Sequence, residues 1–161
     1  MSEEKEVVQE ITREMVHNEF FRLVDNAATV NLLHRQSLPD EIRNDMHPVH
    51  YSFEFCTVHI DIGRMIGKTE YIKRNLAEGV VVIVHNNEAR KALLRDTGGG
   101  KGALIINGNV SEHVLMHDLS VRTANFIFID EPALIKEQNL SVIYQALSKK
   151  DLTQLFILLG K

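Results

Sequence analysis

The chain has 161 residues, of which 44% are hydrophobic and 25% are charged, and its formal net charge is −4. This length supports one domain with a sizeable core, and no apolar run approaches the roughly 18 residues that a membrane-spanning helix needs. The single cysteine, Cys56, excludes an internal disulfide and a cysteine-based zinc site, and its apolar neighbours predict a buried, inert thiol. Because the acidic N-terminus carries no apolar signal segment, we expect a cytoplasmic protein.

The N-terminal third is predicted to be helical. Residues 4–34 carry apolar side chains at roughly helical spacing, and a second helix is expected to begin near Pro39. Residues 47–50 are predicted to be extended or turning, and residues 53–60 to form the first core strand. We expect residues 1–50 to be an N-terminal helical segment that packs across the sheet or mediates self-association, and residues 51–161 to be the core.

Strand and helix patterns alternate through the core. The β-branched run Val80–Val84 predicts a buried parallel strand. Further strands are predicted at residues 103–106, 126–129 and 154–159. Helices are predicted at residues 68–77, 87–96, 111–119 and 132–147, with Asn86 and Ser111 as N-caps. This alternation predicts an α/β fold with a mainly parallel sheet in three α/β/α layers, whose ligands bind beyond the carboxyl ends of the strands.

The segment from Ile62 to Thr69 carries the most specific chemistry. It follows an apolar run and ends in Gly-Lys-Thr, as loops do whose backbone N–H groups cradle phosphates while the lysine reaches the outer phosphates. The match to G-x-x-x-x-G-K-[ST] is imperfect, because Ile62 stands where the first glycine belongs. We predict a nucleotide-phosphate site formed by Gly63, Arg64, Met65, Ile66, Gly67, Lys68 and Thr69.

A second motif follows in the order that such a site requires. The four apolar residues 126–129 precede Asp130 and Glu131, which predicts a buried strand that ends at a carboxylate pair. Behind a phosphate-binding loop, the first acid holds Mg²⁺ and the second orients the attacking water. An ordinary strand ending in a charged turn is the alternative.

These residues resemble a known family. Residues 63–69 resemble the variant phosphate loop of phage large terminases, written Ser/Ala-Arg-x-x-Gly-Lys-Thr/Ser, which also lacks the first glycine and carries an arginine four positions before the lysine. Val80–Val84 with residues 87–90, and residues 124–131, are similar to that family's second strand and carboxylate strand, and DExx-type helicases share this core. The resemblance covers about residues 53–160 and implies a Mg²⁺-dependent ATPase related to nucleic-acid motors, in a host cytoplasm if a phage encodes it.

The resemblance also implies roles. Lys68 would contact the β- and γ-phosphates of ATP, Thr69 and Asp130 would serve Mg²⁺, and Glu131 would be the catalytic base. Arg64 matches the loop arginine proposed as a finger, and a solvated loop residue is its alternative. The chain departs from the family because it has no room for a nuclease or second motor domain, and its last strand ends without a polar residue. A nucleotide-binding module that acts through protein partners without efficient turnover is therefore the alternative.

A second resemblance and several weaker patterns remain. Residues 63–74 with Val80–Val84 are also similar to P-loop thymidine kinases, although those enzymes need a longer segment after the carboxylate strand. His113 and His117 lie one helical turn apart, which suits zinc but is more typical of surface histidines. Residues 64–101 carry eight basic and four acidic residues, which indicates either a nucleic-acid contact or solvated helix faces. Gln36 is a weak candidate for an adenine contact, and the glycine-rich loop around Lys101 for a phosphate contact.

Overall fold

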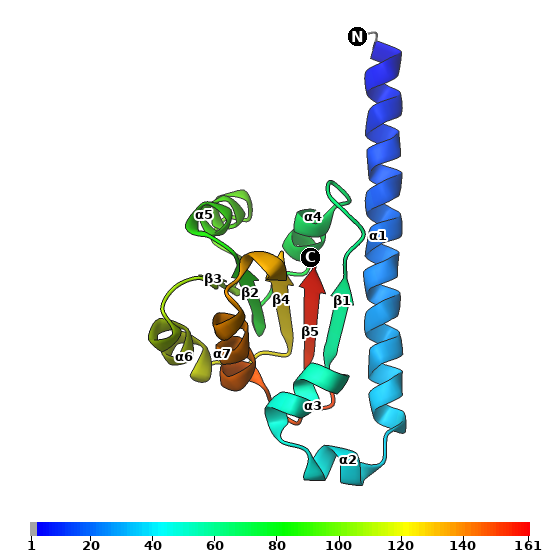
Figure 1. The fold of residues 1–161 in the computed structure, drawn as a ribbon. Coiled ribbons are helices and arrows are strands. Elements are labelled where there is room, and N and C mark those ends of the chain that lie inside the picture. Colours follow the sequence, from blue (N-terminus) through cyan, green and yellow to red (C-terminus); the bar gives the residue numbers. More distant parts are fainter. Residues whose placement is uncertain (1–2) are drawn as a thin grey trace.

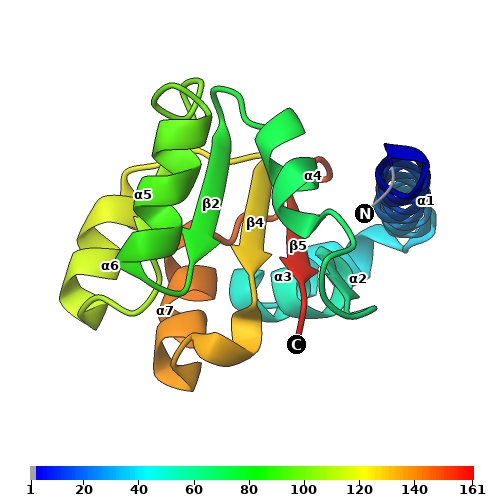
Figure 2. The ribbon, with the colours of Figure 1, turned by 90° about the horizontal axis from the view of Figure 1, so that it is seen from above.

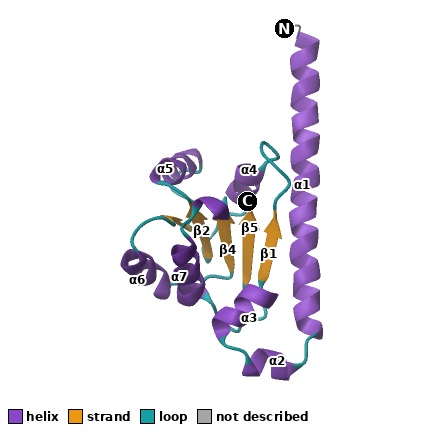
Figure 3. Cartoon of the chain, in the orientation of Figure 1, coloured by secondary structure: helices purple, strands orange, loops and turns teal. Residues whose placement is uncertain are grey.

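The computed structural model describes residues 3–161. Its centre is a five-stranded, entirely parallel sheet with the strand order β1-β5-β4-β2-β3 (Figures 1 and 3). The strands are β1 (Thr57–Ile60), β2 (Val80–Val84), β3 (Leu104–Asn107), β4 (Phe126–Asp130) and β5 (Leu155–Leu159). The α/β class and the parallel sheet predicted from the alternating pattern are thus confirmed.

The described helices connect these strands and extend the chain before the first one. They are α1 (Glu3–Ser37), α2 (Asp40–Asp45), α3 (Pro48–Phe55), α4 (Lys68–Arg74), α5 (Asn87–Asp96), α6 (Glu112–Ser120), the 3₁₀ turn η1 (Pro132–Leu134) and α7 (Glu137–Leu147). Two predicted N-caps are confirmed, because Asn86 accepts a hydrogen bond from the Ala89 backbone N–H and Ser111 accepts one from Val114. The single helix predicted at residues 132–147 is instead η1 followed by α7.

Two apolar cores flank the sheet, one on each face. Residues of α1, α4 and α5 form one core with one face of the sheet, and residues of α6 and α7 form the other core with the opposite face. Viewed from above, the helices lie in layers on either side of the strands (Figure 2). Helix α1 lies beside β1 (Figure 1). The interior strand β2 is buried along its whole length, as its five β-branched residues predict.

The prediction for residues 47–60 was wrong in its first half. Pro48 occupies the first turn of α3, His47 accepts a hydrogen bond from the Val49 N–H, and the strand begins only at Thr57. Pro is favoured at a helix start because its fixed φ suits the first turn and its missing N–H needs no partner there. Tyr51 and Phe55 lie one turn apart on this helix with ring centroids 5.5 Å apart, so the apolar residues follow a helical period rather than a strand period. Cys56 is fully buried, as predicted, but it ends α3.

Helix α1 packs on the domain through only part of its length. The helix predicted for residues 4–34 is confirmed, and its buried contacts come from Phe20, Phe21 and Val24. The N-terminal half extends past the sheet (Figure 1), and Val8 and Ile11 in that half are 61% and 54% exposed. Within residues 3–161, no helix is both long and apolar enough to cross a membrane.

Candidate functional site

The predicted phosphate loop leaves β1 at the carboxyl edge of the sheet. Gly63, Met65 and Gly67 have φ angles of 104°, 58° and 98°, so the backbone turns through the left-handed region at alternate residues before α4 begins at Lys68. Glycine adopts these angles at little cost, whereas Met65 does so less easily and is 85% exposed. The loop is therefore a tight turn that a strand-to-helix connection of ordinary residues would not form.

Asp130, the last residue of β4, lies level with Ile60, the last residue of β1 before this loop. Leu159 of β5 is the register partner of Ile60 at the end of β1 and also of Asp130 at the end of β4. Because β5 lies between β1 and β4, the loop and the carboxylate pair are separated by two strand spacings, about 10 Å. The two predicted motifs therefore lie on either side of the carboxyl end of β5.

The side chains of Lys68 and Glu131 join the two motifs. The Lys68 Nζ donates a short, charge-assisted hydrogen bond to Glu131 Oε1. The Lys68 side chain is only 10% exposed and that of Glu131 28%, so each charge relies on the other as its partner. Because removing charges from water is costly, the pair is stable only while both partners are present.

The backbone after β4 aims Glu131 into this position. Glu131 has φ 51° and ψ 65°, a left-handed conformation at the junction with η1, and its N–H donates to Leu159 O at 2.8 Å. Its side chain lies over Gly160, which is held by its N–H bond to Ile60 O and by His59 Nε2, which donates to Gly160 O at 2.7 Å. The last strand, which ends without a polar side chain, thus leaves room for the glutamate.

An open cavity of about 390 Å³ lies at this edge. Five of its lining residues are charged and include three cations, which suits an anionic ligand: Asp61, Arg64, Lys68, Glu131 and Lys161. Gly63 and Met65 also line it, whereas Ile66, Gly67, Thr69 and Asp130 do not. Sequence reasoning missed Asp61, which directly follows β1, and Lys161, which lies two residues after β5. Both lie at the carboxyl edge of the sheet, where ligand-binding residues are expected.

The surroundings of Asp130 disfavour its ionised form. Burial raises the pKa of its carboxyl group and the neighbouring Glu131 raises that pKa further, while Lys68 and His85 act in the opposite direction. The Nδ1 atom of His85 is buried and has no hydrogen-bond partner among the residues that the structure describes. The pKa of Asp130 is therefore raised overall, chiefly because its carboxyl group is buried.

These features fit the Mg²⁺ that the two motifs imply. Mg²⁺ prefers oxygen ligands, binds through one or two carboxylates and keeps several waters. Asp130 and Thr69 would supply the oxygens, and a bound cation would relieve the charge repulsion between Asp130 and Glu131. Across the described part of the chain, no group of three or more His, Cys, Asp or Glu side chains is arranged to hold a metal by protein ligands alone.

Helix α1 touches the phosphate loop directly. A Cβ atom placed on Gly67 would lie 2.9 Å from the His17 ring, so a larger residue at this position would require that ring to shift. Two further contacts tie α1 to α4: Tyr71 donates to Asp25 at 2.7 Å, and the Arg74 guanidinium lies 4.6 Å from the centre of the Phe21 ring. Helix α1 thus packs against the predicted loop and α4, and the sequence did not predict these contacts.

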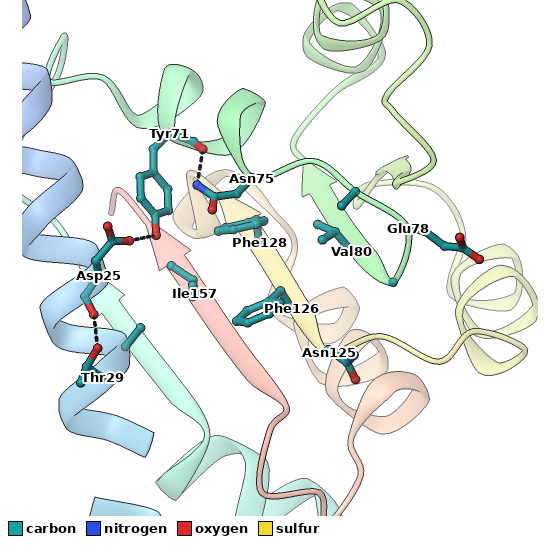
Figure 4. Close-up of a pocket in the computed structure, with 13 residues that line it drawn as sticks. Asp25, Thr29, Tyr71, Asn75, Glu78, Val80, Asn125, Phe126, Phe128 and Ile157 are labelled. Atoms are coloured by element: carbon teal, nitrogen blue, oxygen red, sulfur yellow. Dashed lines mark hydrogen bonds between the residues drawn. The ribbon is translucent and has the colours of Figure 1, made fainter. Parts of the chain in front are cut away.

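A second cavity, of about 470 Å³, opens between α1 and α4 toward the amino ends of β2 and β4 (Figure 4). Phe126, Phe128 and Ile157 form its apolar floor, and the Asp25–Tyr71 hydrogen bond crosses one side (Figure 4). It contains none of the residues of the predicted phosphate site. Of these two cavities, the one at the carboxyl edge therefore gathers more charged side chains.

The weaker sequence candidates lie elsewhere. Gln36 is near the C-terminal end of α1, about 28 Å of helix from His17, and thus far from the loop. Lys101 precedes β3 and lies at the amino edge of the sheet. His117 interacts with Asp118, at 3.0 Å, rather than with His113.

Several cations of the basic segment are already engaged. Lys73 bonds to Glu70 and Asp96, Arg90 donates to Ile105 O, and Arg74 lies on Phe21. Since these side chains have intramolecular partners, the segment offers less free positive charge than its sequence indicates.

Comparison of the chain with protein-family models and with curated proteins finds no match. The fold is that of a parallel α/β protein with a charged site at the carboxyl edge of its sheet. Any function is therefore argued from the residues of that site.

Proposed function

We propose that this protein binds ATP with Mg²⁺ as a P-loop nucleotide-binding protein and hydrolyses the γ-phosphate. One observation carries the proposal: Lys68, from the loop after β1, and Glu131, from the end of β4, meet beside one open cavity. Two sequence motifs that are separated by about 60 residues thus supply a cation and a carboxylate to the same site.

The residues would take distinct roles. Lys68 would leave Glu131 and bind the β- and γ-phosphates, and Arg64, which lines the same cavity, would contact the γ-phosphate. Thr69 and Asp130 would hold Mg²⁺, which would neutralise charge on the phosphate oxygens. Glu131, released from Lys68, accepts a proton from the attacking water as the new P–O bond forms and the bond to the ADP oxygen breaks.

The relation to terminase- and helicase-like motors is part of this proposal. It is supported by the loop, which lacks the usual first glycine and whose Arg64 lines the cavity, and by the glutamate that directly follows Asp130. The alternative without efficient turnover is favoured by one feature. Gly160 stands at the end of β5, where it supplies no side chain to sense the γ-phosphate.

The proposal is tested by ATP binding and phosphate release, with and without DNA. Wild type is compared with Lys68→Ala and Glu131→Gln, and Lys91→Ala, an exposed lysine on α5, is the matched control. Loss of the charged hydrogen bonds of Lys68 should weaken ATP binding roughly 10- to 100-fold. ATP binding that does not depend on Lys68 would contradict the nucleotide site. ATP binding without any release of phosphate would favour the alternative function, a nucleotide-binding module without turnover.

A further inference from the structure

The outer face of α1 carries a stripe of exposed residues that runs along most of the helix. Counting along the helix at 3.6 residues per turn, this face lies roughly opposite Phe20, Phe21 and Val24, which pack on the domain. The stripe consists of Val8, Ile11, Met15, Glu19, Arg22, Asn26, Val30 and Leu33. Its five apolar members are 54–66% exposed.

The spacing of this outer stripe reads the same in both directions. Successive members are separated by 3, 4, 4, 3, 4, 4 and 3 residues. Such an 11-residue repeat averages about 3.67 residues per turn, so the stripe stays on one side of a nearly straight helix. Its ends are apolar, and its centre, Glu19 and Arg22, is charged.

We infer that α1 pairs with α1 of a second copy of this chain, antiparallel, through the outer stripe. A two-fold axis passes between residues 20 and 21. Each residue then faces the residue of the other copy for which the two residue numbers add up to 41. Val8 then lies opposite Leu33, Ile11 opposite Val30, and Met15 opposite Asn26. Because a two-fold interface is self-complementary, each of these contacts occurs twice.

The central charges select the antiparallel direction. In this register Glu19 of each copy faces Arg22 of the other, and the two residues already pair within one helix at 2.8 Å. Both side chains are at least 70% exposed and free to reach a partner. A parallel pair in register would instead place Glu19 on Glu19 and Arg22 on Arg22, and such like-charge contacts are unfavourable.

The pairing accounts for the N-terminal half of α1. That half extends past the sheet and leaves Val8, Ile11 and Met15 in solvent (Figure 1). In the pair, these residues pack on the C-terminal half of the partner's helix. The two domains lie on opposite sides of the helix pair, and His17, on the inner face, stays on Gly67, so the cavity at Lys68 remains open.

Sedimentation and light scattering over a wide concentration range test the pairing. Wild type should be a dimer, and Ile11→Asp should shift it to monomer. Glu19→Arg and Arg22→Glu should each weaken the dimer roughly tenfold or more, because each places like charges at the centre. Glu10→Arg, the same charge change on the inner side of the helix, is the control and should leave the dimer unchanged.

Mixing makes the test independent of folding. Glu19→Arg chains mixed with Arg22→Glu chains should form heterodimers as stable as wild type, since each arginine then faces a glutamate. Ile11→Cys chains should cross-link to Val30→Cys chains and not to themselves. A monomer at every concentration, a dimer that ignores both charge reversals, or self-cross-linking of Ile11→Cys would each overturn the inference.

Discussion

Glu131 lies over Gly160 so closely that a larger residue at position 160 would require the glutamate side chain to move. A Cβ atom at position 160 would lie 2.7 Å from Glu131 Cδ, nearer than real Cβ atoms approach. The absence of a side chain at the end of β5 therefore permits the carboxylate to reach Lys68. Position 160 controls the glutamate by its size.

Replacing Gly160 by alanine should displace Glu131 and break its bond to Lys68. We expect phosphate release to fall more than ATP binding, because Lys68 remains available for phosphate while the glutamate loses its position. The φ of 107° adds a backbone cost of about 1 kcal/mol. Gly98→Ala is the matched control, since its φ is also positive but its Cβ meets nothing. Equal effects of the two substitutions on release would refute this role.

Glu131→Gln should bind ATP more tightly than wild type while turning it over more slowly. The neutral amide holds Lys68 less strongly, so less free energy is needed to hand the lysine to phosphate, and the base that accepts the water proton is lost. General-base removal typically costs roughly 10²- to 10⁴-fold in rate. Calorimetric titration with ATP and single-turnover assays measure the two effects separately. Weaker ATP binding in this variant would contradict a competing Lys68–Glu131 bond.

Arg64→Ala should lower the hydrolysis rate with little change in ATP affinity. An arginine that acts on the transition state can contribute roughly 10³- to 10⁵-fold. Arg95→Ala, whose side chain is 76% exposed on α5, is the control. If both variants hydrolyse ATP at the wild-type rate, Arg64 is a solvated loop residue.

Asp130→Asn should stabilise the ligand-free protein at pH 7. Burial and Glu131 raise the pKa of Asp130 in the folded protein above the unfolded value of 3.8. The folded state therefore holds the proton more tightly, so stability is lost as the pH rises from 3.8 through the folded pKa. The variant lacks this loss. Its gain in Tm over wild type should be largest at neutral pH and should shrink as the pH falls toward 4; a gain that does not vary with pH would contradict this account.

Gly67→Ala should destabilise the protein through two separable terms. The left-handed φ of 98° costs an alanine roughly 1–2 kcal/mol, and the methyl group also meets the His17 ring. His17→Ala removes the second term alone. Urea unfolding of both single variants and the double variant should therefore give a double variant more stable than additivity requires. Strict additivity would show that His17 does not press on the loop.

The sequence indicated which residues of the two motifs lie at the carboxyl edge, because each motif is local. A Gly-Lys-Thr after one strand and two acids after another fix which residues reach the carboxyl edge, once the sheet is parallel. It failed at residues 48–55, where Phe53 and Phe55 suit either a strand or a helix, and the N-terminal turn at Pro48 decided for the helix. Local periodicity is ambiguous for such short apolar runs.

The chain by itself determined the parallel sheet, the N-caps and the candidate cation and carboxylates, since these follow from neighbouring residues and from the period of apolar positions. Only the tertiary structure decided the strand order that places β5 between β1 and β4, the seat of Glu131 on Gly160, and the contact of His17 with Gly67. Each of these joins residues at least 29 positions apart in the sequence. Their approach depends on how whole elements pack, which no local pattern encodes.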